Sequence, residues 1–109
     1  MNTPDNNDNA LKEILKERIK YCKEEINNFN FQLKGLEEAI KISKKFIAET
    51  IKKEQNGTVV FFDLYKKKNA MELLNSSEAS KKNIELCLKA TTDMLEDAYL
   101  QCFRLKFKI

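Results

Sequence analysis

The chain has 109 residues, of which 42% are hydrophobic and 34% are charged, with only two glycines and one proline. This length provides one modest core, so a second independently folded domain is not expected, and the shortage of turn-forming residues excludes an all-β sandwich. The net charge is +3, and the excess lies in residues 41–82, which hold ten basic and five acidic side chains. A composition rich in Lys, Glu, Leu and Ile favours long helices.

The cysteines and the absence of histidine argue against a metal site. Cys22, Cys87 and Cys102 form no C-x-x-C pair, and the chain contains no histidine, so the common zinc spacings are excluded. No run of about 18 apolar residues is present to cross a membrane, and Met1–Asn9 lacks the basic and apolar regions of a secretory signal. We expect no metal, no cofactor and a cytoplasmic location, although a mature secreted form would have the same sequence.

The sequence assigns no catalytic residue. Histidine, the commonest general base, is missing, and two isolated glycines cannot form a P-loop or a dinucleotide fingerprint. The adjacent carboxylates Glu24 and Glu25, like Glu37 and Glu38, point about 100° apart on a helix and do not converge on one site. The chain is therefore not expected to be an enzyme.

The first eight residues are predicted to be a disordered tail. They are polar, include Pro4 and show no apolar periodicity. Asp8 or Asn9 can cap the helix that follows, because a short side-chain oxygen accepts hydrogen bonds from the first free amides. Residues 9–109 are expected to form a single helical domain.

Apolar side chains then recur at alternating steps of three and four residues, which is the heptad pattern of a coiled coil. Five consecutive heptads follow without a slip. Position a holds Ile19, Ile26, Leu33, Ile40 and Ile47, and position d holds Leu15, Cys22, Phe29, Leu36, Ser43 and Thr50. The pattern predicts one helix over residues 9–54, with its likeliest bend at Asn27, Asn28, Asn30 and Gly35. Asn56–Gly57 is expected to end it.

The middle and the end of the chain leave alternatives open. Residues 58–65 are rich in β-branched and aromatic side chains typical of a short strand, but Asp63 can instead cap a short helix over 62–74, which we favour. Asn75 or Ser77 is predicted to cap the last helix. Residues 103–109 alternate between apolar and basic, so this segment is a second candidate strand.

The expected fold is an all-α antiparallel helical hairpin, resembling a coiled-coil bundle, with a short middle element. A last helix of about 28 residues would cover the first helix only beyond about residue 26. The apolar stripe before that point would then lack an intramolecular partner and is predicted to bind a second copy or a helix of another protein. Its residues are Leu11, Ile14, Leu15, Ile19 and Cys22.

A lysine-rich group is expected at the connecting end of the hairpin, where it could bind a polyanion such as nucleic acid. Its members are Lys44, Lys45, Lys52, Lys53, Lys66, Lys67, Lys68, Lys81 and Lys82. Nearby acidic residues oppose this function. The aromatic side chains Phe61, Phe62 and Tyr65 are more simply interpreted as a cap of the core.

The three cysteines are expected to act as small hydrophobic residues on the apolar helix faces. A disulfide between Cys22 and Cys102 is the alternative. Taken together, the sequence predicts a non-enzymatic protein-protein interaction module, such as an adaptor, inhibitor or small effector, that docks a coiled-coil helix face onto a partner or onto itself. A nucleic-acid-binding or regulatory protein that uses the lysine-rich end is the alternative.

Overall fold

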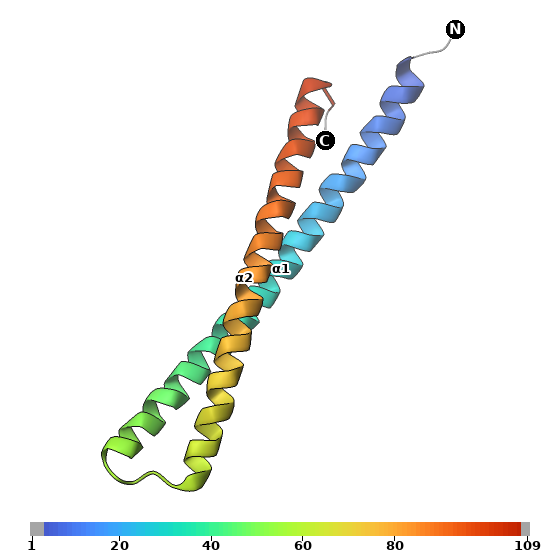
Figure 1. Cartoon of the computed structure of the whole chain (residues 1–109). Coiled ribbons are helices and arrows are strands. Elements are labelled where there is room, and N and C mark those ends of the chain that lie inside the picture. The colour runs from blue at the N-terminus through green and yellow to red at the C-terminus, as the bar shows by residue number, and fades with distance from the viewer. Residues whose placement is uncertain (1–3, 108–109) are drawn as a thin grey trace. The chain divides into compact units, whose positions relative to one another are not determined.

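The computed structural model describes the backbone of residues 4–107 and the side chains of residues 8–107. Two long α-helices make up almost all of this part of the chain: α1 spans Pro4–Gln55 and α2 spans Phe61–Arg104 (Figure 1). The helices run antiparallel and are joined by residues 56–60, and residues 4–107 contain no strand. The predicted all-α antiparallel hairpin is confirmed.

The residues group into two compact units, each built from a segment of both helices. The terminal unit comprises Met1–Asn30 and Leu86–Ile109, and the turn unit comprises Phe31–Glu85. The single domain expected over residues 9–109 stays a prediction. Residues 1–3 of the expected tail lie outside the described residues, whereas the backbone is helical from Pro4. Proline is compatible with a first helical turn because its missing N–H would have no partner there.

The heptad positions a and d predicted for α1 are the positions whose side chains are shielded from solvent. Leu15, Ile19 and Cys22 are buried, the remaining apolar a and d residues are half-buried, and the helix continues through the Asn-rich stretch. Two buried d positions are polar. The hydroxyl of Thr50 donates to the Phe46 carbonyl oxygen at 3.0 Å, and Ser43 Oγ has no hydrogen-bond partner among the described residues.

The second half of the chain differs from the sequence expectation, because α2 is one helix of 44 residues. The separate helix over 62–74 and the new helix start at Asn75 or Ser77 are both wrong. Side chains shielded from solvent recur at steps of four and three without interruption from Asp63 to Cys102, so packing continues through the expected cap. Ser77 is buried within this stripe, and the Ser76 hydroxyl donates to the Leu73 carbonyl oxygen at 3.1 Å.

The strand alternative over residues 58–65 is also wrong, because α2 begins at Phe61. The Val60 N–H donates to the Asp63 carboxylate at 3.2 Å, and the Val60 carbonyl oxygen accepts from the Asp63 and Leu64 N–H groups. A carboxylate at the third helical position that reaches back in this way is half of a capping box. The aspartate predicted as a helix cap thus stabilises the helix start from inside the first turn.

Residues 103–107 of the second candidate strand end a helix and form no strand. The Lys106 N–H donates to the Phe103 carbonyl oxygen and the Phe107 N–H donates to the Cys102 carbonyl oxygen, with Lys106 at a positive φ of 58°. This is the Schellman motif, and Phe107 packs against the core cluster that contains Cys102. Residues 108–109 lie outside the described residues.

The same motif ends α1, as the sequence predicted from Asn56–Gly57. Gly57 has φ of 70°, a left-handed conformation that is strained for residues with a Cβ. The Thr58 N–H donates to the Lys53 carbonyl oxygen at 2.9 Å, and the Gly57 N–H donates to the Glu54 carbonyl oxygen at 3.3 Å. Otherwise unpaired carbonyl groups at the helix end are satisfied, which allows the chain to reverse within five residues.

The core of the terminal unit joins the start of α1 to the end of α2. Leu15 and Ile19 cluster with Ala98 and Cys102, and Leu11, Leu95 and Phe107 pack against them. The expectation that this part of α1 lacks an intramolecular partner is wrong. Its premise was a last helix of about 28 residues, whereas α2 is long enough to cover the start of α1.

We predict that Leu15→Ala lowers the free energy of unfolding by about 2–5 kcal/mol, because this side chain is only 1% exposed and its truncation leaves a cavity. Its neighbour Ile14 is 55% exposed, so Ile14→Ala should cost about 0.5 kcal/mol or less. Urea unfolding followed by circular dichroism measures both values. Equal losses for the two variants would contradict the assignment of Leu15 to the core.

Candidate functional site

The five residues predicted to bind a partner are split by their burial. Leu15, Ile19 and Cys22 are buried, Leu11 is half-buried, and only Ile14 is well exposed. A partner would reach the buried three only if α2 moved away from them. Their role in binding stays a prediction, and Ile14 is the member that already presents a surface. Tyr21, seven residues later, is also well exposed and occupies the same heptad position.

The cysteines follow the expectation in part. All three thiols are free, and Cys22 and Cys102 are buried as small hydrophobic side chains. Cys102 belongs to the terminal core cluster, whereas Cys22 lies outside it. Cys87 is exposed, so its expected place on the buried face is wrong, because the neighbouring residue Leu88 occupies the stripe position.

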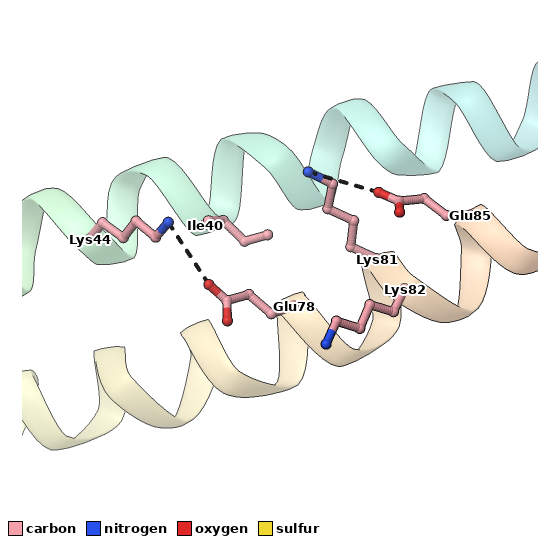
Figure 2. A pocket seen from close by; sticks show the side chains of 6 residues that line it. All are labelled: Ile40, Lys44, Glu78, Lys81, Lys82 and Glu85. Carbon is pink, nitrogen blue, oxygen red and sulfur yellow. Dashed lines mark ion pairs between the residues drawn. The ribbon is translucent and has the colours of Figure 1, made fainter.

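One flank of the turn unit is charged. Lys44 Nζ lies 3.9 Å from Glu78 Oε1 across the two helices, and Lys81 Nζ lies 3.8 Å from Glu37 Oε1 and 3.9 Å from Glu85 Oε1. Lys44, Glu78, Lys81 and Glu85 line a groove of about 280 Å³ together with Ile40 and Lys82, and Figure 2 shows these six side chains. The alternating signs make this flank a network of exposed ion pairs, each of which contributes little to stability.

The predicted lysine group is partly neutralised near the turn as well. Lys53 Nζ lies 3.4 Å from Asp63 Oδ1, and Lys67 Nζ lies 2.7 Å from Glu54 Oε1. Lys66 Nζ lies 4.5 Å from the centre of the Phe62 ring, a cation–π contact. The members of the group for which the described residues provide no ion pair are Lys45, Lys52, Lys66, Lys68 and Lys82.

The apolar side chains at the turn are exposed, so their expected role as a cap of the core is wrong. Phe61 is 84% exposed, and Phe62 and Tyr65 are also mostly exposed. The reason is their position: the buried stripe of α2 starts at Asp63 and continues at Lys67, leaving these aromatic residues on the outer face of the helix. They therefore form an apolar surface beside lysines.

The surroundings of Asp63 lower the pKa of its carboxyl group. The hydrogen bond from the Val60 N–H is the largest cause that lowers the pKa below 3.8, and the hydrogen bond and positive charge of Lys53 lower it further. The charged form of Asp63 thus stabilises the start of α2 and fixes Lys53 of α1 beside it.

Two grooves follow each other along the turn unit and are almost free of charge. One groove, of about 440 Å³, is lined by Gln32, Gly35, Leu36, Ser80 and Ile84. The other groove, of about 240 Å³, is lined by Ile42, Ser43, Phe46, Ala70 and Leu73, with Lys66 at its end nearest the turn. We call the uncharged residues that line these grooves the neutral face.

The heptad register explains why the charged flank and the neutral face are separate. In α1, Glu37 and Lys44 directly follow stripe residues and occupy heptad position e. Gln32 and Phe46 directly precede stripe residues and occupy position g. Positions e and g flank the buried stripe on opposite sides. The neutral face could not be predicted from the sequence, because it is recognised only by the absence of charged residues. The positions that must lack charge come from both helices, and their pairing has to be known first.

The side chains of the described residues offer no group of three or more Cys, Asp or Glu residues arranged to hold a metal ion. Neither α1 nor α2 contains a segment apolar enough to cross a membrane.

No protein-family model matches the chain, and neither a curated protein nor a solved structure matches it.

Protonation of Asp63 should weaken the turn. Because its folded-state pKa lies below the ordinary value of 3.8, its stabilising contribution is complete above about pH 4 and is lost as the pH falls through the lowered pKa. We predict that the difference in Tm between the wild type and D63N is largest at pH 7 and smaller at about pH 2. E49Q, which removes another exposed carboxylate near the turn, controls for the change in net charge. A D63N effect that is the same at both pH values would contradict the assignment.

Proposed function

We propose that the protein is a non-enzymatic interaction module, an adaptor, inhibitor or small effector, that acts by docking its exposed apolar helix faces onto a protein partner or onto a second copy. The observation that supports this proposal is the large number of exposed hydrophobic side chains compared with the number that are buried. Among the described residues, eighteen large hydrophobic side chains are exposed, whereas five hydrophobic residues are buried. Exposed apolar surface on this scale is typical of binding sites.

The fold favours docking by helix faces over binding of a small molecule in a pocket. Two antiparallel helices can shield only a narrow stripe of each other, and stable helical bundles usually add further helices to cover the rest. Ile26, Leu33 and Ile40 lie on the buried stripe and yet remain only half-buried. A third or fourth helix laid along the pair would complete their burial, which is the coiled-coil mode of recognition.

The proposal is tested by capture with the immobilised chain from an extract of cells that produce it, followed by mass spectrometry. A variant with I42S and L73S in the turn unit and L100S and F103S in the terminal unit replaces four exposed apolar side chains. We predict that capture falls by about tenfold or more, since exposed anchors of an interface commonly contribute more than 1 kcal/mol each.

The matched control changes the charged flank instead, with K44S, E78S, K81S and E85S. These exposed ion pairs contribute little to stability, so the control should fold and retain its partner. The proposed function is wrong if the wild type captures no protein. It is also wrong if the variant with I42S, L73S, L100S and F103S captures every protein that the wild type captures, its own chain included.

A second candidate function is polyanion binding at the turn, and the exposure of Phe61, Phe62 and Tyr65 beside lysines favours it. Aromatic rings in such a setting stack on bases while cations contact phosphates. We predict that any affinity for single-stranded nucleic acid falls steeply with salt and is weakened by K66Q, K67Q and K68Q together. Fluorescence anisotropy measures it, and the absence of binding at about 50 mM salt would remove this candidate.

A further inference from the structure

The neutral face of the turn unit is exposed to water, although a single charged residue, Lys66, lines its two grooves. Ile42 is 58% exposed and Leu73 is 50% exposed, one from each helix. Gly35 and Ile42 are seven residues apart in α1, and Leu73 and Ser80 are seven residues apart in α2, so the two grooves occupy one flank of the pair. Charged residues line a different groove of this unit, on the opposite flank. The neutral face is therefore the side of the turn unit suited to burial.

The presence of glycine at position 35, on the same face, is a second and independent observation that favours an interface there. A glycine inside a helix lowers stability by about 1 kcal/mol relative to alanine. Gly35 has no positive φ, and nothing lies within 4 Å of the position that a Cβ would occupy. Neither the backbone conformation nor the packing within the single chain therefore requires glycine at this position. The missing side chain instead leaves room in the groove for a second backbone to approach closely.

We propose that the neutral face is the interface of a homodimer, in which the neutral faces of two copies pack against each other about a two-fold axis. This inference rests on the proposed function and names the partner as a second copy. An uncharged face meets an identical face without like-charge repulsion, and a two-fold axis closes the assembly at two copies. With the axis perpendicular to the helices, the Lys66 residues of the two copies lie at opposite ends of the interface. The product is a four-helix bundle around the turn units.

Sedimentation equilibrium on the full chain tests the proposal. The wild type is expected to have twice the mass of 12.8 kDa at about 100 µM and to dissociate on dilution. Gly35→Leu and Ile42→Glu should each raise the dissociation constant by about tenfold or more. Gly35→Leu has open space in the single chain and a better helix former, so its helicity should match or exceed that of the wild type.

Phe31→Glu is the matched control, because Phe31 lies in the turn unit, is 79% exposed and lines neither groove. This variant should remain a dimer. The proposal is overturned if the wild type has the mass of one chain at every concentration, or if Phe31→Glu dissociates the dimer while Gly35→Leu and Ile42→Glu do not. A monomeric wild type that still captures another protein would overturn the homodimer and leave the proposed function standing.

Discussion

The contact between α1 and α2 depends on one narrow stripe of side chains in each helix. A heptad repeat points about two of every seven residues at the facing helix, and both helices keep this spacing without interruption, in α2 from Asp63 to Cys102. The stripe fixes which residues are buried and, because it is narrow, leaves most apolar side chains outside it. The exposed apolar surface and the clean separation of charged and uncharged flanks are both consequences of this repeat.

The stripe has different chemistry in the two units. In the terminal unit it buries Leu15, Ile19 and Ala98, and the hydrophobic effect stabilises the pair directly. In the turn unit its buried members are the hydroxyl residues Ser43, Thr50 and Ser77, so burial contributes less to stability. Exposed ion pairs and the capped turn add only modest stability there. Further apolar contact would therefore stabilise the turn unit more than the terminal unit, and the neutral face lies on the turn unit.

The register of α1 and its end at Gly57 could be predicted from the sequence, since apolar spacing and glycine conformation are local properties. The continuity of α2 could not. Asn75 and Ser77 carry the signature of a helix cap, and only packing against a facing helix overrides it. That error in length left Leu15 without a partner in the predicted fold, whereas α2 covers it. The neutral face could not be predicted either, because its grooves combine residues from both helices.

The tight turn also sets an order in which the chain can fold. Lys53 and Asp63 are ten residues apart and meet across the turn, so closing that loop costs little chain entropy. Leu15 and Cys102 come from nearly opposite ends of the chain and meet at the highest entropic cost. When contacts form in order outward from the turn, each contact shortens the segment of free chain that the next contact must close. The core of the terminal unit closes the longest loop of the chain, so we expect its contacts to form after those at the turn.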